Sequence, residues 1–389
     1  MIYERLIKNI EDNYQNHLKG GFNFIPIGFD RFSKFVPGIV KSSYTIVTAS
    51  SGVGKSKLVR ALYVVNVLDF IKEHPEIKVI IPIFSLELSA EEYLADILCS
   101  FLYRDYDIEI SYRELLSIHA KGEEVRINQD IIDKLKNYDD WIKFFYKSVR
   151  IYSDIHNPYG IFKKVKEIIN QSVKGKESVK LDDEGYEMKF WDYDDNNIFV
   201  IPILDQINLL ATEKNLPDLR SAMIKFSADY ALTLKNYYQC HLIVIQQQSS
   251  DKERVEHDMS GKAINSKLEP SLDGLGDCKT TQREATEVIG LFAPDRYEIN
   301  EHSGYNITIF KDTYRSIKLL KSRYTSPNKK IGMLFRGGIG TFEELPRPEE
   351  FQSDRDYIKY LTEKGVIKEE KKEPVKKEKI KLGTFKAND

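Results

Sequence analysis

Residues 49–56 constrain the fold of this chain more than any other stretch. They read Ala-Ser-Ser-Gly-Val-Gly-Lys-Ser, the phosphate-binding pattern GxxxxGK[ST] with Ala49 in place of its first glycine. An apolar run over 44–48 precedes them and a helical pattern follows, as a strand–loop–helix phosphate site requires. Gly52 and Gly54 allow backbone N–H groups to turn toward phosphate oxygens, and a helix N-terminus adds partial positive charge. The stretch therefore predicts a nucleotide-binding site.

The residues of this loop have separate expected tasks. Lys55 is expected to reach the β- and γ-phosphates of ATP, and the Ser56 hydroxyl is expected to ligate Mg²⁺. The residues expected to surround the nucleotide are Ser50, Ser51, Gly52, Val53, Gly54, Lys55, Ser56 and Lys57. The alternative is a turn rich in Gly and Ser without a ligand, which the flanking strand and helix patterns make the weaker reading.

Two carboxylates follow other predicted strands. Asp205 ends the apolar run 198–204, and a carboxylate there could hold Mg²⁺ at the sheet edge that carries the phosphate loop. Glu87 follows the run 78–84 and could polarise the water that attacks the γ-phosphate. Each has a plainer reading, because an acid at a strand end also serves as a helix N-cap or as a charge favoured by the helix dipole.

Three glutamines, Gln246, Gln247 and Gln248, end the strand predicted over 241–246. An amide at this edge of the sheet could sense the γ-phosphate. A polar loop without such a role is the alternative, and the residues themselves leave open which of the three points inward.

Apolar runs alternate with helical patterns from residue 44 onward. Strands are predicted over 44–48, 78–84, 149–152, 198–204, 241–246 and 288–292, and helices over 55–73, 90–103, 159–171 and 218–238. Strands that are apolar throughout and separated by helices predict an α/β fold, with a mostly parallel sheet covered by helices on both faces. After these, the segments 305–310, 315–321 and 330–335 predict consecutive strands, a C-terminal β-hairpin extension.

The sequence divides into a core and peripheral segments. Residues 1–21 contain one amphipathic helix, from Ile2 to about Leu18, which needs a surface to pack on. Residues 22–345 form the predicted core domain, and its segment 177–195, with eight acids and two lysines, is expected to be a surface hairpin or loop. Residues 346–389 are expected to be a charged, largely disordered tail.

Composition excludes several classes of protein. Lys and Arg number 58 and Asp and Glu 60, so the net charge of −2 neither favours nor excludes a nucleic-acid partner. The apolar runs are too short for a membrane span, and the N-terminus lacks the apolar core of a secretory signal. The cysteines Cys99, Cys240 and Cys278 are far apart, which favours a reduced, cytoplasmic setting over a disulfide or zinc framework.

The run Phe84-Ser85-Leu86-Glu87-Leu88-Ser89-Ala90-Glu91 closely resembles the FSLEMSxE element of DnaB-type replicative helicases. Residues 27–30, Ile-Gly-Phe-Asp, are similar to the start of that family's ATPase domain, and alanine at the first position of the phosphate loop is typical of it. Residues 321–323, Lys-Ser-Arg, resemble the family's KxR element. The resemblance covers about residues 22–345.

This resemblance implies a RecA-like P-loop NTPase that forms a ring, expected to be a hexamer, and uses ATP and Mg²⁺ to move 5′ to 3′ on single-stranded DNA during replication. It implies that Glu87 is the catalytic base, Asp205 the Walker-B acid and Gln247 the glutamine of the central strand. It further implies that Arg323 is an arginine finger, with Lys321 as its companion, acting on ATP held by the neighbouring subunit. A solvated basic hairpin is the alternative for the last two.

The candidate DNA-binding loop runs from Ser249 to about Arg283, a long polar stretch between two strands. Its basic side chains and glycines could contact phosphates without reading bases. The expected contacts are Arg254, Lys262, Lys267, Gly276, Lys279 and Arg283. At 274–279 the sequence departs from the LRESG-like stretch of the family.

About 21 residues precede the core, where such helicases carry a collar domain that binds primase. The sequence is therefore expected to be a compact, collar-less and phage-encoded version, acting in the host cytoplasm with a primase or helicase loader as partner. The alternative function is a RecA-like, DNA-dependent ATPase, a recombinase or loader, that does not unwind. A nucleotide-binding protein without turnover is the third reading, and intact Lys55, Ser56, Glu87 and Asp205 argue against it.

Overall fold

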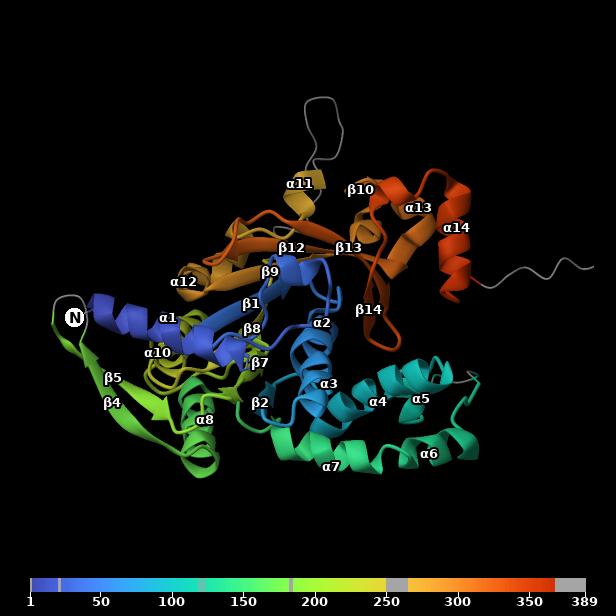
Figure 1. The fold of residues 1–389 in the computed structure, drawn as a ribbon. Helices are drawn as coiled ribbons and strands as arrows, with labels where there is room; N and C mark the ends of the chain where they lie inside the picture. The colour runs from blue at the N-terminus through green and yellow to red at the C-terminus, as the bar shows by residue number, and fades with distance from the viewer. Residues whose placement is uncertain are drawn as a thin grey trace, which may run out of the picture.

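The computed structural model describes residues 2–367 apart from 20–21, 119, 121, 123, 182–184 and 250–264. At its centre lies a ten-stranded sheet with the order β14-β13-β12-β9-β1-β8-β7-β2-β3, and β6 pairs with β2 off this path (Figure 1). Of the helices in the described part, none is long and apolar enough to cross a membrane.

The predicted parallel sheet is confirmed. Its strands, which pair in parallel, are β1 (Ser43–Ala49), β2 (Lys78–Ser85), β3 (Val149–Tyr152), β6 (Ile198–Val200), β7 (Ile203–Asp205), β8 (His241–Gln247) and β9 (Glu287–Phe292). The run predicted as one strand over 198–204 is divided into β6 and β7. Pro202 stands at the division, where its missing N–H cannot join a ladder of hydrogen bonds.

Helices cover both faces of the sheet, as predicted. Successive residues of β1 alternate between two cores: Tyr44 and Ile46 face one, and Val47 and Ala49 face the other. The second of these cores is closed by α2 (Lys55–Arg60), a π-helical segment (Ala61–Val65), α3 (Asn66–Glu73), α4 (Ala90–Tyr106) and α7 (Asp139–Ser148). The first is closed by α8 (Pro158–Ser172), α9 (Leu219–Lys225), a π-helical segment (Phe226–Ala231), α10 (Leu232–Asn236) and α12 (Lys279–Glu284).

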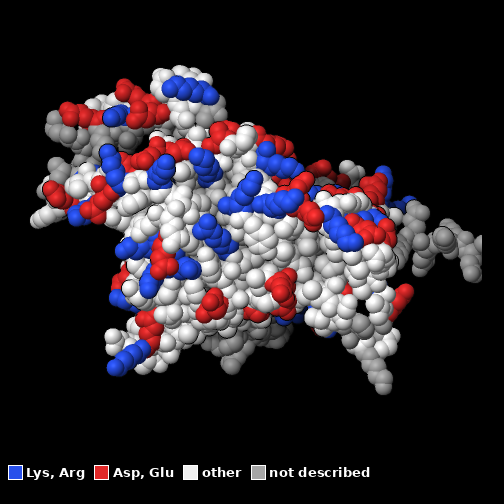
Figure 2. All heavy atoms as spheres, turned by 90° about the horizontal axis from the view of Figure 1, so that it is seen from below, with Lys and Arg blue, Asp and Glu red and all other residues white. Residues whose placement is uncertain are grey.

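Shorter helices connect these elements. The α-helical ones are α5 (Tyr112–Leu115), α6 (Gln129–Lys136) and α11 (Asn265–Leu268), and the 3-10 segments are Phe32–Lys34, Ile207–Leu209, Asp273–Cys278, Pro294–Tyr297, Lys311–Thr313 and Pro348–Glu350. Figure 2 shows the face seen from below in Figure 1, over which positive and negative side chains are interspersed.

The C-terminal strands form the expected antiparallel extension. β12 (Tyr314–Ser322) pairs with β9 and with β13 (Lys330–Arg336), which pairs with β14 (Thr341–Glu344). The strand predicted over 305–310 is wrong: β11 (Tyr305–Asn306) pairs only with β10 (Glu301–His302), and α13 (Ile307–Phe310) follows. The Asn306 side chain accepts a hydrogen bond from the Thr308 N–H at 3.1 Å, and this N-cap starts a helix despite β-branched neighbours.

The peripheral segments differ in how they pack. The acidic insertion is a hairpin of β4 (Gly175–Leu181) and β5 (Glu187–Tyr193). The chain after 345 was expected to be a disordered tail, but it contains α14 (Asp354–Glu363), whose Tyr357 and Leu361 are buried against the β13 side of the sheet. The apolar spacing of this helix outweighs its charged composition, so the expectation is wrong up to residue 367; residues 368–389 lie outside the described part.

Candidate nucleotide-binding site

The phosphate loop lies between β1 and α2, where its glycines have the backbone geometry that the pattern predicts. Gly52 has φ of 69° and Gly54 has φ of 108°, both in the left-handed region that favours glycine. A Cβ atom at Gly54 would come within 2.9 Å of Cζ of Phe335. Only glycine therefore fits at the residue that leads into α2.

The functional side chains of the loop meet a carboxylate from another strand. The Ser56 hydroxyl donates a hydrogen bond to Oδ1 of Asp205 at 2.9 Å, and Lys55 Nζ donates to the Ser50 carbonyl at 2.9 Å. Lys55 and Asp205 are both buried. Since β7 and β1 flank β8 and run in parallel, their carboxyl ends bring these groups to one edge of the sheet.

The surroundings of Asp205 suit a bound cation. Burial raises the pKa of its carboxyl to about 6, and the Glu87 carboxylate acts in the same direction, while the hydrogen bond from Ser56 and the charge of Arg60 lower it. A carboxylate that burial destabilises in this way gains from a positive charge beside it. A hydroxyl and a carboxylate oxygen are ligands that Mg²⁺ prefers, so Ser56 and Asp205 fit this ion.

Glu87 is exposed in the turn between β2 and α4, and this turn is fixed at both ends. The Leu86 N–H donates to the Asp205 carbonyl at 2.6 Å, and the Ser85 hydroxyl donates to the Leu88 carbonyl at 2.7 Å. After the turn, Ser89 caps α4, in a reciprocal capping box with a glutamate of the first turn. Glu87 is thereby held at the rim of the cavity that the phosphate loop lines.

The structure distinguishes the three glutamines after β8. Gln246 is buried and accepts a hydrogen bond from the Thr281 hydroxyl at 2.7 Å. Gln248 is also buried and donates to the Thr48 hydroxyl at 2.9 Å. Gln247 is only partly buried and lies in register with the first residue of the phosphate loop. Its side chain is the least buried of the three, and it lies outside the lining of the nucleotide cavity.

A cavity of about 470 Å³ opens beside the phosphate loop. Besides Lys55, Ser56 and Glu87, its lining includes residues that the sequence patterns missed, among them Arg296, Arg315 and Phe335. The side chain of Arg296 donates to the Ser51 carbonyl, and Nε of Arg315 donates to the Val53 carbonyl at 2.9 Å. The guanidinium of Arg315 also lies 4.5 Å from the centre of the Phe335 ring. Two arginines thus hold the backbone of the loop from outside.

Arg315 is only 2% exposed, and charged residues are seldom buried so fully without partners that hold them. The sequence carried no sign of this burial, because β12 also contains Lys318 and Lys321, and nothing in the residue pattern separates Arg315 from these lysines.

Lys321 and Arg323 lie far from this cavity. β12 carries Arg315 near its beginning, beside the phosphate loop, and Arg323 directly follows its end, eight residues later. At about 3.3 Å per strand residue, the two positions are roughly 26 Å apart. Arg323 is exposed, whereas Lys321 Nζ donates to the carbonyls of Gln282 and Arg283 at the end of α12, at 2.6 and 3.0 Å. Burial and the charge of Arg323 lower the pKa of Lys321.

The basic C-terminal hairpin is mostly not a solvated face. Lys318 and Lys330 form ion pairs with Glu269, at 2.9 and 2.5 Å, and Arg336 is buried with its guanidinium 4.7 Å from the centre of the Tyr103 ring. Arg315 and Lys321 also donate hydrogen bonds to backbone carbonyls. Five of the eight Lys and Arg residues in 311–336 therefore contact other groups of the protein. Arg323 remains exposed, next to the helix end that Lys321 caps.

Of the six predicted DNA contacts, the structure describes four. Arg254 and Lys262 lie outside the described residues. Lys267 is exposed on α11, Gly276 is exposed in the 3-10 segment before α12, and Lys279 and Arg283 are exposed on α12 itself. A side chain at Gly276 would meet open space, so the approach of a backbone there is not blocked. Lys279 and Arg283 stand four residues apart on α12 and so share one side of that helix. Contact of these four residues with DNA stays a prediction.

No family model matches the sequence, and no curated protein matches it. Solved structures do match. One of them, the structure of an ATPase domain, aligns with a TM-score of 0.60 and 15% identity, over 89% of this chain and 99% of that one. A DnaB-like replicative helicase, studied with its interactions with primase, aligns with a TM-score of 0.59 and 14% identity, over 87% of this chain and 66% of that one.

The chain shares the fold of these two structures, an α/β fold with a mostly parallel sheet. This confirms the fold class and the structural resemblance predicted from the phosphate loop, the FSLE run and the KxR element. At 14–15% identity the match shows the fold, and the roles of single residues depend on the geometry described above.

Proposed function

We propose that the chain is an ATP-driven, ring-forming DNA helicase that translocates 5′ to 3′ on single-stranded DNA during replication. One observation supports this most: the groups needed for hydrolysis lie at opposite ends of the sheet. Lys55, Ser56, Asp205 and Glu87 gather at one cavity, and Arg323 is exposed about 26 Å from it along β12. A ring of subunits, each facing the next with a different surface, would bring the two ends together.

The residues of the cavity have complementary tasks in this proposal. Lys55 exchanges the Ser50 carbonyl for the β- and γ-phosphates, and the N–H groups around Gly52 and Gly54 face the same oxygens. Ser56 and Asp205 would hold Mg²⁺, which, when bound, neutralises charge on the transferred phosphoryl group.

The attacking water and the transition state are served by other groups. Glu87 orients the water and accepts its proton from the rim of the cavity. The Arg323 guanidinium of a neighbouring subunit, with Lys321 holding the helix end beside it, stabilises the charge that develops on the phosphoryl oxygens. Gln247, beside the loop at the end of β8, links the phosphate site to the segment that follows it.

The oligomer is supported by α1 (Ile2–Leu18). Its side chains Leu6, Ile10, Tyr14 and Leu18 are spaced four apart and are 51–60% exposed. Side chains at this spacing share one face of a helix, and an exposed apolar stripe of this kind marks a protein–protein contact. We infer that it packs on the adjacent subunit, in a homo-oligomer that is most simply a hexamer.

The DNA path and the partners are extensions of the same proposal. Lys267, Gly276, Lys279 and Arg283, with the region before them, would face single-stranded DNA inside the ring and contact phosphates rather than bases. A primase or a helicase loader is the proposed protein partner, and the cytoplasm the proposed location.

The experiment is steady-state ATP hydrolysis with and without single-stranded DNA. The substitution Glu87→Gln is expected to lower kcat by about a hundredfold or more while ATP binding persists, because it removes the base but leaves the phosphate contacts. Glu91→Gln, the same change on the exposed first turn of α4, is the matched control and should act like the wild type. Full turnover in the Glu87 variant would contradict the proposal; DNA-stimulated turnover without any unwinding would favour a recombinase or loader instead.

A further inference from the structure

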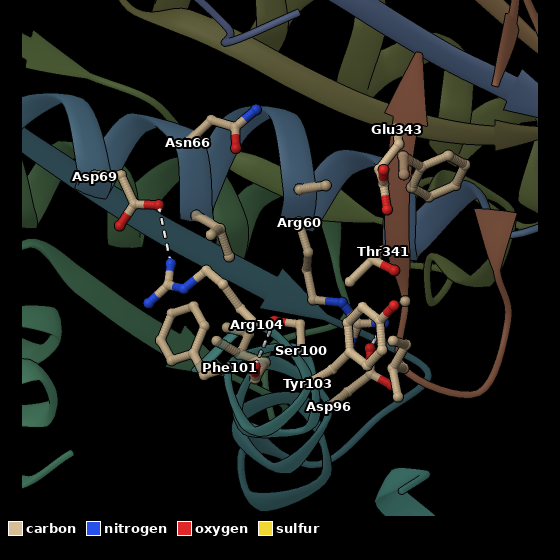
Figure 3. Close-up of a pocket in the computed structure, with 16 residues that line it drawn as sticks. Arg60, Asn66, Asp69, Asp96, Ser100, Phe101, Tyr103, Arg104, Thr341 and Glu343 are labelled. Atoms are coloured by element: carbon tan, nitrogen blue, oxygen red, sulfur yellow. Dashed lines mark hydrogen bonds and ion pairs between the residues drawn. The ribbon is translucent and has the colours of Figure 1, made fainter. Parts of the chain in front are cut away.

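A second cavity, of about 270 Å³, lies between the helix that follows the phosphate loop, α4 and β14 (Figure 3). Apolar side chains such as Val65, Ile97 and Phe342 form much of its wall. Figure 3 shows Arg60, Tyr103 and Thr341 gathered at one end of the cavity and Asp69 with Arg104 at the other. Apart from Arg60, which also lines the nucleotide cavity, none of these residues has a task in the proposed hydrolysis.

Two hydrogen-bonding atoms at the Arg60 end are buried without a partner in the described part of the chain. One is Nη1 of Arg60, a residue only 4% exposed, and the other is Oγ1 of Thr341. Nη2 of Arg60 is already engaged by Asp96 at 2.5 Å, and the guanidinium lies 4.9 Å from the centre of the Tyr93 ring. A buried donor without an acceptor costs free energy, and an acceptor placed in the cavity would recover it.

The charges around the cavity are balanced. Asp96 pairs with Arg60 and with Lys57, and Asp69 pairs with Arg104 at 3.3 Å. The remaining carboxylate of the lining, Glu343, forms an ion pair with Lys364. A charged ligand would lose its hydration without gaining an unpaired counter-ion, so the lining favours a neutral one.

We propose that this cavity is a second ligand site, for a neutral planar ring compound that carries a carbonyl acceptor. The acceptor takes hydrogen bonds from Arg60 Nη1 and Thr341 Oγ1, and the ring lies against the apolar wall. Cavities for small molecules range from about 300 to 1,000 Å³, so a volume of about 270 Å³ suits one or two rings.

The site is coupled to the nucleotide cavity through shared residues. Arg60 lines both cavities, and so does the hairpin of β13 and β14. Phe335 and Gly337 of this hairpin line the nucleotide cavity, and its residues Ile339 to Glu343 line the second one. Lys57 ties the two together, because its Nζ donates both to Asp96 and to the Gly337 carbonyl, at 2.9 and 2.7 Å. A ligand that positions Arg60 and this turn changes nucleotide affinity, and nucleotide changes ligand affinity by the same factor. This coupling rests on the proposed nucleotide site, whereas ligand binding itself does not.

The test uses four probes of one shape, titrated by calorimetry into the full chain without nucleotide. Benzamide has the neutral carbonyl; benzoate is anionic, benzamidine is cationic and ethylbenzene has no acceptor. Benzamide is expected to bind with one site per chain and more tightly than the other three. Equal binding of all four, or no binding of benzamide, would overturn the proposal.

Variants locate the binding. Thr341→Val keeps the shape of the side chain and removes one hydrogen bond, so it is expected to weaken benzamide binding about fivefold. Ser100→Leu fills the cavity from α4 and is expected to abolish binding, and should this variant not fold, Thr341→Val alone decides. Thr362→Val, the same change on the exposed part of α14, should bind benzamide as the wild type does. Benzamide binding unchanged in Thr341→Val would contradict the assigned site.

The coupling is measured separately, with a fluorescent N-methylanthraniloyl ATP titrated in the presence and absence of saturating benzamide. A change of twofold or more in ATP affinity, lost in Thr341→Val and kept in Thr362→Val, is the expected result. ATP affinity that benzamide leaves unchanged would overturn the coupling while the ligand site stands. ATP that does not bind at all would instead refute the proposed function, and the calorimetric result would still decide the ligand site.

Discussion

Mixing two inactive variants should restore hydrolysis if Arg323 acts on nucleotide held by a neighbouring subunit. Lys55→Ala removes the phosphate lysine, and Arg323→Ala removes the finger, which β12 places about 26 Å from the loop of its own chain. An arginine side chain extends only a fraction of that distance. In a randomly mixed ring, half of the subunits have intact Lys55, and half of their neighbours have intact Arg323. An active interface needs both residues, so about one quarter of the interfaces are active. About one quarter of wild-type activity is therefore expected.

The assay is phosphate release on single-stranded DNA after subunits are dissociated, combined in equal amounts and reassembled. A second mixture, of wild type with the Lys55→Ala/Arg323→Ala double variant, serves as the internal comparison. If the finger acts between subunits, both mixtures give about one quarter of full activity. If it acts within a chain, the first mixture stays inactive and the second gives about one half. That second pattern, or full activity of Arg323→Ala alone, would contradict an arginine finger that acts between subunits.

Three further predictions follow from single contacts. Gly54→Ala should reduce ATP affinity at least tenfold, because the residue has φ of 108° and its Cβ would meet the Phe335 ring at 2.9 Å; fluorescence titration with an ATP analogue measures this, and wild-type affinity would contradict it. Burial raises the pKa of Glu287 to about 7, so ionisation of this carboxyl opposes folding. The free energy of unfolding is therefore unaffected below about pH 4.5, and it falls by about 3 kcal/mol as the pH rises past 7. Urea unfolding at pH 5 and pH 9 should show that loss in the wild type and not in Glu287→Gln, with parallel profiles as the refuting result. Finally, Leu6→Glu with Ile10→Glu should lower the oligomer mass in light scattering, whereas an unchanged mass would show that α1 does not join subunits.

Much of the site could be predicted because its residues stand at strand ends. Ser56, Asp205 and Glu87 each follow an apolar run, and parallel strands bring their carboxyl ends to one edge of a sheet. The residue pattern alone left the three glutamines equal, since the alternation of a strand shows sides but not which side faces a ligand, and only the family resemblance favoured Gln247. Gln246 and Gln248 turned out to be bonded within the protein.

The other lining residues could not be predicted from local patterns. Arg315 and Phe335 reach the phosphate loop only because β12 and β13 add to the far side of β9. Arg296 follows the end of β9, which pairs in parallel with β1, the strand that leads into the loop. The sequence did not distinguish Arg315 from Lys318 and Lys321 of the same strand. The register that sets Arg315 beside Val53 depends on the whole extension and not on any short motif.

The errors in the fold have physical causes as well. The segment 305–310 has strand-like residues, but the Asn306 side chain caps a helix and gives the backbone another partner. In 346–389, charge dominated the composition and concealed the spacing of Tyr357 and Leu361, which places both on the buried face of α14. In both segments, a local hydrogen bond or a few buried apolar residues determined the secondary structure. The average composition of the segment did not predict it.

In the proposed function, hydrolysis in one subunit is completed by Arg323 of the next and drives unwinding. Strand displacement on a forked DNA with ATP and Mg²⁺ examines both steps together, when Arg323→Ala is compared with Arg355→Ala, the same change at an exposed arginine of α14. We predict ATP-dependent unwinding by the wild type and by Arg355→Ala, and a loss of about a thousandfold or more in Arg323→Ala. Unwinding that survives in Arg323→Ala would contradict the claim.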